Sequence, residues 1–281
     1  MTMISSINRF IGLFVDSLRQ MGRGRIWLML IGYSVLTWFV LYMHYAFTSP
    51  AFYGLVSGWT SLFGEQEATG FSHYPGHFLM LPYFFGWAKF LMGLILEGLV
   101  LGAVARQFFI GFAGADNNPG FPSRSILASW GHLIMGWLLL NGLILLISFK
   151  LPQIVSPLIQ YSPRREMLFE FAVMPFIYIL IFALFFTVIP MLSLYRINVF
   201  GAAKRSLLMF FRNPFTCLFL SGFIMVGPVV ISFVTSRPAQ IVDKLKPELV
   251  YWVLVVALVV DVIANFLWMG TAVRLIIDEE E

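Results

Sequence analysis

Apolar and polar positions alternate along this chain in long blocks, without the short period of a soluble helix or strand. Six blocks are predominantly apolar over about 20 residues or more, and a helix of that length crosses the roughly 30 Å hydrocarbon core of a bilayer. Charged residues, proline or Asn/Gly clusters bound each block. The pattern predicts spans at residues 26–47, 84–105, 126–149, 168–194, 215–235 and 249–273.

Backbone polar groups inside hydrocarbon must be satisfied within the spanning structure, so a span is a helix or a strand of a closed barrel. The blocks lack the alternating ten-residue pattern of barrel strands. We therefore predict an all-α fold, a polytopic transmembrane bundle whose six spans form three hairpins within a single domain, residues 1–281.

Two amphipathic segments precede spans that leave the cytoplasm, and both are expected to lie in the membrane interface. Residues 1–24 place apolar side chains on one helical face, and the segment before the fifth span repeats this design with Val199, Ala203, Leu207 and Phe210. The polar faces are basic, which predicts contacts with lipid headgroups. The cations expected to make these contacts are Arg19, Arg23, Lys204, Arg205 and Arg212.

A short echo links the three predicted hairpins. Ser17-Leu18, Ser125-Ile126 and Ser206-Leu207 each stand just before or at a span that leaves the cytoplasm, with arginine nearby. The echo is consistent with a degenerate threefold repeat.

Residues 202–214 read AAKRSLLMFFRNP and contain an alanine, a serine four residues later and an asparagine seven after that. This spacing resembles a motif of several uncharacterised bacterial polytopic membrane families, most of which carry tryptophan where Leu207 stands. The resemblance implies an inner-membrane protein of about six spans and no established activity. Helical packing explains the same pattern without a site, because small residues pack against a bundle while cations meet headgroups.

The composition excludes a sizeable soluble domain. Hydrophobic residues make up 59% of the 281 residues and charged residues only 11%, whereas a soluble domain is about 25% charged. With the N-terminus in the cytoplasm, eleven Lys and Arg lie inside and six outside, and residues 48–83 carry none. The positive-inside rule therefore predicts that both termini are cytoplasmic, and the net charge of +4 indicates topology and no nucleic-acid partner.

Ionisable residues inside spans are costly and are functional candidates by default. Lys89 and Glu97 fall in the second span, and Asp261 and Asn265 in the sixth. Counted from Arg106 and Arg274, Glu97 and Asn265 lie at equal depth, which predicts a polar seam between the two spans. One reading is a proton or cation site with a carboxylate of raised pKa; the other is a satisfied interhelical network.

Two further features bear on chemistry. Pro175, Pro190 and Gly227-Pro228 would free backbone carbonyls of the kind that line transporter sites. The histidines His44, His73 and His77 are weak candidates for a metal site near the outer surface. No catalytic, nucleotide-binding or metal-binding motif is recognisable, so neither an enzyme nor a cofactor is predicted.

These observations favour a noncatalytic subunit or assembly factor of a membrane complex, with membrane lipids and other subunits, or further copies of itself, as partners. The alternative is a proton- or cation-coupled transporter or channel that uses the seam between spans 2 and 6.

Overall fold

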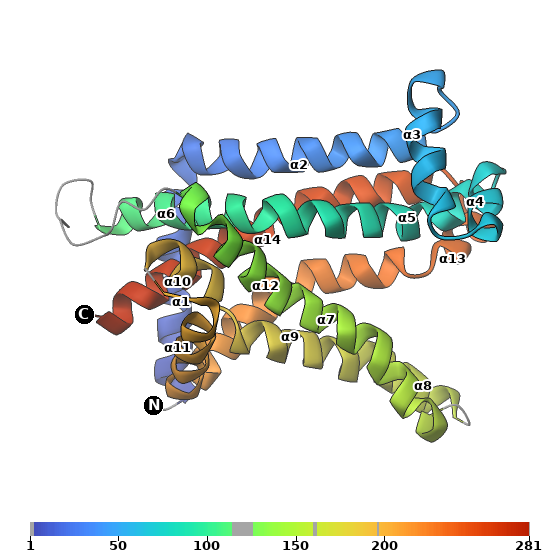
Figure 1. Ribbon diagram of the computed structural model, residues 1–281. Helices are drawn as coiled ribbons and strands as arrows, with labels where there is room; N and C mark the ends of the chain where they lie inside the picture. The colour runs from blue at the N-terminus through green and yellow to red at the C-terminus, as the bar shows by residue number, and fades with distance from the viewer. Residues whose placement is uncertain (1–2, 114–125, 160–161, 196, 281) are drawn as a thin grey trace. The chain divides into compact units, whose positions relative to one another are not determined.

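The computed structural model describes residues 3–113, 126–159, 162–195 and 197–280, and all regular structure in these residues is helical (Figure 1). Six helical stretches are long and apolar enough to cross a membrane. They are Gly24–Tyr45, Gly76–Ala113, Ile126–Leu158, Pro163–Leu194, Pro214–Thr235 and Leu249–Glu280. The predicted all-α, multi-span fold is confirmed.

Several stretches are subdivided by 3₁₀- or π-turns, and short helices join them. The elements are α1 (Met3–Arg19), η1 (Gln20–Gly22), α2 (Gly24–Tyr45), α3 (Pro50–Ser61), α4 (Glu65–Ser72), α5 (Gly76–Met92), η2 (Gly93–Glu97), α6 (Gly98–Ala113), η3 (Ile126–Ser129), α7 (Trp130–Ile159), α8 (Pro163–Leu168), η4 (Phe169–Val173), α9 (Met174–Leu184), α10 (Val188–Leu194), α11 (Val199–Arg212), α12 (Pro214–Thr235), α13 (Pro238–Lys244) and α14 (Leu249–Glu280).

Helices extend beyond the apolar blocks that predict them. The second stretch begins at Gly76, eight residues before the expected residue 84, and ends at Ala113, eight after the expected residue 105. Hydropathy marks only the part of a helix that is suited to hydrocarbon, whereas the backbone hydrogen bonds continue into polar surroundings. Five of the six predicted spans therefore lie within longer helical stretches, whereas the first, predicted at residues 26–47, ends two residues beyond Tyr45.

The described chain forms two compact units. The first comprises Met1–Met29, Leu94–Met225 and Asn265–Glu281, and the second comprises Leu30–Gly93 and Val226–Ala264. Because the unit boundaries fall inside α2, α12, α14 and the π-turn η2, these elements contribute residues to both units.

The core of the first unit is built around α10, whose residues are all buried and which packs against α6, α7 and α11. Glycine allows the close approach of α6 to α7: a Cβ atom at Gly98 would lie 2.8 Å from the Leu133 carbonyl oxygen. Small residues at such contacts are typical of helix packing in membranes, where lipid tails supply no hydrophobic driving force between helices.

The core of the second unit is rich in aromatic rings from α4 and α5. Phe71 is buried and packs edge-on against Phe84 with ring centroids 5.0 Å apart, and apolar residues of α14 such as Leu254 and Leu258 join the same cluster. Edge-to-face pairs of this kind add about 0.5–1.5 kcal/mol beyond the area they bury.

The two amphipathic helices pack on the bundle through strips that contain small residues, and part of each predicted apolar face is left outside these strips. α1 buries Ser6, Leu13 and Ser17, while Ile11, which lies on the apolar face predicted for residues 1–24, is exposed. The small residues allow close packing on α14, because a Cβ atom at Gly270 would lie 2.9 Å from the Ser17 Cβ. α11 similarly buries the strip Ala202, Ser206, Met209 and Phe210, of which only Phe210 belongs to the predicted apolar face. The second copy of the predicted repeat begins at Arg124-Ser125, outside the described residues.

Candidate functional site

The second unit contains one of the two predicted polar pairs. The Lys89 ammonium of α5 donates to the Asp261 carboxylate of α14 and forms an ion pair with it. The two side chains are 33% and 31% exposed, so the pair is partly buried within helices suited to hydrocarbon. Pairing offsets part of the cost of placing each charge in such a segment.

The first unit contains the other predicted pair together with a residue that the sequence did not indicate. The Asn265 side-chain amide donates to Glu97 Oε1 at 3.2 Å, and the Trp137 indole donates to Glu97 Oε2 at 3.2 Å. Both carboxylate oxygens therefore accept a hydrogen bond from a neutral N–H group. Glu97, Trp137 and Asn265 are called the Glu97 trio below.

The Glu97 trio lies at an irregular part of the backbone. Glu97 is the last residue of the π-turn Gly93–Glu97, and π-turns inside helices occur frequently at functional sites. The Ile95 carbonyl oxygen in the same turn accepts from the Trp130 indole at 2.8 Å. Trp130 and Trp137 are seven residues apart on α7, about two helical turns, so both indoles leave the same face. That spacing is the sequence signal that would have placed them.

A second irregular backbone interrupts the fourth spanning stretch between α9 and α10. Pro190 has no N–H to donate to the carbonyl four residues earlier, which belongs to Phe186. The indole of Trp268 on α14 donates to that carbonyl oxygen instead, at 2.8 Å. The predicted freed carbonyl therefore exists, but it is used inside the protein.

Ser206 of α11 satisfies further backbone groups at the same break. Its hydroxyl donates to the Leu184 carbonyl oxygen at 2.8 Å and accepts from the Thr187 N–H at 3.4 Å. Ala202 beside it is fully buried. Ala202 and Ser206 are the first two positions of the sequence pattern noted in residues 202–214, so packing and hydrogen bonding at the break account for these two.

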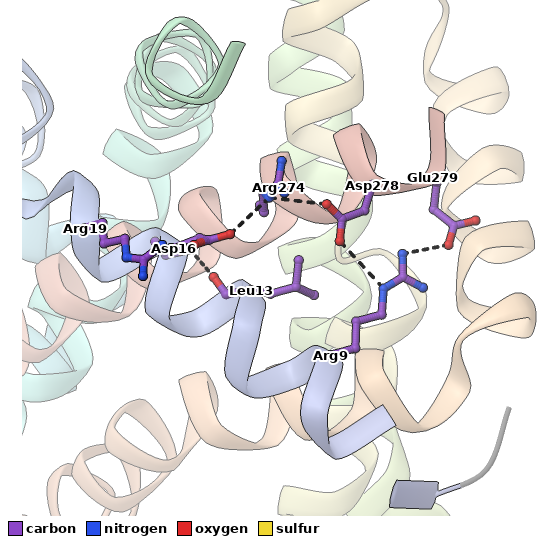
Figure 2. A network of polar contacts seen from close by, with 8 residues as sticks. Arg9, Leu13, Asp16, Arg19, Arg274, Asp278 and Glu279 are labelled. Carbon is purple, nitrogen blue, oxygen red and sulfur yellow. Dashed lines mark hydrogen bonds and ion pairs between the residues drawn. The ribbon is translucent and has the colours of Figure 1, made fainter. Parts of the chain in front are cut away.

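A charge network joins α1 to the last turns of α14 (Figure 2). Arg9 donates to Glu279 at 2.9 Å and lies 3.9 Å from Asp278, and Arg274 bridges Asp278 and Asp16, each at 3.2 Å. Asn213, the last position of the pattern, accepts from Arg9 at 2.7 Å and donates to Glu279 at 2.8 Å. Both ends of the described chain therefore meet in the first unit.

The five cations expected at lipid headgroups have different surroundings. In the N-terminal region, Arg19 pairs with Asp16 at 3.1 Å and Arg23 donates to the Gly111 carbonyl oxygen at 3.3 Å. On α11, Lys204 and Arg205 are exposed, and Arg212 is 72% exposed with Glu279 at 3.9 Å.

Tyr195 lies next to the basic face of α11. Its hydroxyl donates to Glu280, and the Arg205 guanidinium lies 5.7 Å from the centre of its ring. Burial, followed by the hydrogen bond and the negative charge of Glu280, raises the pKa of Tyr195 above its usual value.

The structure buries two of the three candidate metal-binding histidines in the second unit. His77 stacks on Phe47 and meets Phe71 edge-on, both with centroids 4.5 Å apart, and His44 hydrogen-bonds the Val40 carbonyl oxygen at 2.8 Å. His73 is exposed. Among the described residues, no group of three or more His, Cys, Asp or Glu side chains is arranged to hold a metal ion.

Comparisons with protein-family models, with curated proteins and with solved structures find no match to this chain. It is a multi-span membrane protein by its six candidate spanning helices.

Proposed function

We propose that this chain is a noncatalytic subunit or assembly factor of a larger complex in a bacterial inner membrane, with both termini in the cytoplasm. The observation that supports this most directly is an apolar stripe on α1. Ile4, Ile7, Ile11 and Val15 follow one another at helical spacing and are all exposed. Exposed apolar patches are typical of protein or membrane contact surfaces.

The opposite side of α1 is held in place. Arg9 and Asp16 are bound to the end of α14. At the edge of the stripe, about 20° from Ile7, Phe14 packs edge-on against Phe223 of α12 with ring centroids 5.0 Å apart. A helix that is already fixed loses less conformational freedom when a partner binds. The stripe is therefore suited to a partner helix.

The intramembrane polar residues agree with this proposal. Lys89 is bound to Asp261, and Glu97 to Asn265 and Trp137, all within the chain. Such pairs contribute modestly to helix association, about 0.6 kcal/mol for an average interhelical hydrogen bond. They serve a scaffold as well as they would serve a transport path.

The test is extraction from the native membrane in mild detergent, through a C-terminal tag on a flexible linker, followed by measurement of mass and composition. We expect a stoichiometric complex with other membrane proteins. The double variant Ile4→Gln/Ile11→Gln should lose the partner, while the matched control Ile154→Gln/Leu158→Gln, on an exposed part of α7, should retain it. A lone protomer or a homo-oligomer from wild-type membranes would contradict the proposal.

The Glu97 trio supports a second candidate, a proton- or cation-coupled transporter or channel. Proton relays use carboxyl groups inside spanning helices, and Glu97 is such a group, placed at a π-turn and hydrogen-bonded by neutral donors. Proteoliposomes with an internal pH dye and an imposed potassium diffusion potential would report proton uptake. Uptake above that of empty vesicles, abolished by Glu97→Gln, would support transport. Uptake that is unchanged in Glu97→Gln would remove the trio from the path.

A further inference from the structure

The exposed face of α11 combines bulky apolar side chains with positive charge. Phe200 is 85% exposed and Phe211 71%, and Leu208 is exposed between them. The basic residues Lys204, Arg205 and Arg212 are exposed on the same helix, which contains no Asp or Glu. These six residues are called the α11 surface below.

Helical geometry orders the α11 surface from an apolar edge to a basic edge. At about 100° per residue, Phe200 and Phe211 point within about 20° of each other. Arg205 and Arg212 also lie within about 20° of each other, roughly 100–140° further round the helix. Lys204 and Leu208 fall between the two edges. Such an arrangement suits a helix in the interface plane, with one edge among acyl chains and the other among headgroups.

The opposite side of α11 is fixed to the first unit. Ser206 bonds to the broken fourth stretch, and Ala202 is fully buried. The α11 surface is therefore held in one orientation before any ligand arrives.

Among the described residues, one cation of the α11 surface forms an ion pair, Arg212 with Glu279. Glu279 lies 3.9 Å from Arg212 but only 2.9 Å from Arg9, which takes the shorter contact. Arg205 lies over the ring of Tyr195, an arrangement that holds the guanidinium without removing its charge. A ligand that complements this surface has an anionic group next to an apolar body.

We propose that the α11 surface binds anionic phospholipid. Phe200 and Phe211 insert among the acyl chains, and Lys204, Arg205 and Arg212 contact phosphate groups. By contrast, Arg23 donates to a backbone carbonyl and Arg19 pairs with Asp16, so the predicted headgroup contacts concentrate on α11. This inference is independent of the proposed role as a subunit.

The experiment is a titration of the purified full chain in a neutral detergent with phosphatidylglycerol or phosphatidylcholine of equal chain length, with bound lipid counted by native mass spectrometry. We expect phosphatidylglycerol to bind more tightly than phosphatidylcholine. Each basic residue near an anionic surface contributes about fivefold to binding. The triple variant Lys204→Gln/Arg205→Gln/Arg212→Gln should therefore weaken phosphatidylglycerol binding by about tenfold or more.

A matched control separates this surface from a general effect of charge. Lys150→Gln/Arg164→Gln/Arg165→Gln also removes three exposed cations, and it should leave the phosphatidylglycerol affinity within about twofold of wild type. Equal losses in the two triple variants would overturn the proposal. So would equal affinities of the wild type for the two lipids.

Two further measurements address folding and the source of the phosphate. Phe200→Ala/Phe211→Ala keeps every cation and should still weaken lipid binding, because it removes the acyl contact. Elution as a single peak, with an unfolding midpoint near that of wild type, is required of each variant that enters the comparison. If inorganic phosphate competes with phosphatidylglycerol at equal concentration, the surface is a phosphate site and the lipid assignment is wrong.

Discussion

Replacing Trp268 with phenylalanine should destabilise the first unit more than the loss of an average membrane hydrogen bond does. The indole donates at 2.8 Å to the carbonyl oxygen of Phe186, a residue with no exposed surface. Pro190 removes the N–H that would otherwise serve that carbonyl, so no helical donor replaces the indole. We expect a cost of about 1–3 kcal/mol, the range for leaving a buried acceptor unsatisfied, against about 0.6 kcal/mol for an average interhelical bond in a membrane.

Steric trapping in bicelles measures the free energy of unfolding without relying on tryptophan fluorescence. Trp252→Phe is a suitable control, since that side chain is 59% exposed and its replacement should cost less than about 0.5 kcal/mol. A double-mutant cycle gives the sharper test. Pro190→Ala restores an N–H four residues after Phe186, the spacing of a helical bond, so the cost of Trp268→Phe should fall by about 1 kcal/mol in that background. Equal costs in both backgrounds would refute the reasoning.

Three further predictions concern other contacts. Lys89→Met or Asp261→Asn alone should each destabilise the second unit by about 1–3 kcal/mol in steric trapping, and the combined change should cost less than the sum, because it leaves no unpaired charge in a spanning helix. Gly98→Ala would place a Cβ atom 2.8 Å from the backbone of α7 and should lower the free energy of unfolding by about 1–3 kcal/mol. Gly131→Ala, whose Cβ would meet nothing within 4 Å, should lower it by less than about 0.5 kcal/mol. Similar values for the two variants would show that α6 and α7 separate freely. The raised pKa of Tyr195 favours its protonated form in the folded state, so the free energy of unfolding should fall as the pH rises above about 10, the pKa of an unfolded tyrosine. Tyr195→Phe should remove that part of the pH dependence. An unchanged pH dependence in this variant would exclude Tyr195 as its source.

The sequence predicted those contacts whose partners can be matched by their depth along the spanning helices. Lys89 and Asp261 form a pair, and so do Glu97 and Asn265. A helix rises about 1.5 Å per residue, and each of the two spanning stretches has an arginine, Arg106 or Arg274, near its C-terminal end from which to count. Charged residues are rare in apolar segments and have few possible partners there, so their pairing can be predicted from a single sequence.

The contacts that the sequence did not predict depend on irregular backbone and on pairs of residues that the hydrophobic periodicity does not indicate. Hydropathy does not show that the helix adopts a π-turn ending at Glu97, so it cannot place the Trp137 indole against that carboxylate. The amphipathic pattern places Arg9 on the polar face of α1, whose arginines are predicted to lie near lipid headgroups. Arg9 instead binds acidic residues about 270 positions away, and an amphipathic pattern contains no information about such a partner.

The Glu97 trio differs from the other polar contacts of the first unit in what it satisfies. The indoles of Trp130 and Trp268 bond to backbone carbonyls, which the fold must satisfy in any case. Glu97, Trp137 and Asn265 bond to side chains, and their mutual bonds satisfy needs that the three residues themselves create. Apolar residues of similar size would remove those needs, and replacing a buried polar cluster in this way is often neutral or stabilising. Backbone satisfaction therefore accounts for Trp130 and Trp268 but does not account for the carboxyl group at the π-turn, which makes Glu97 the first position at which to look for an activity.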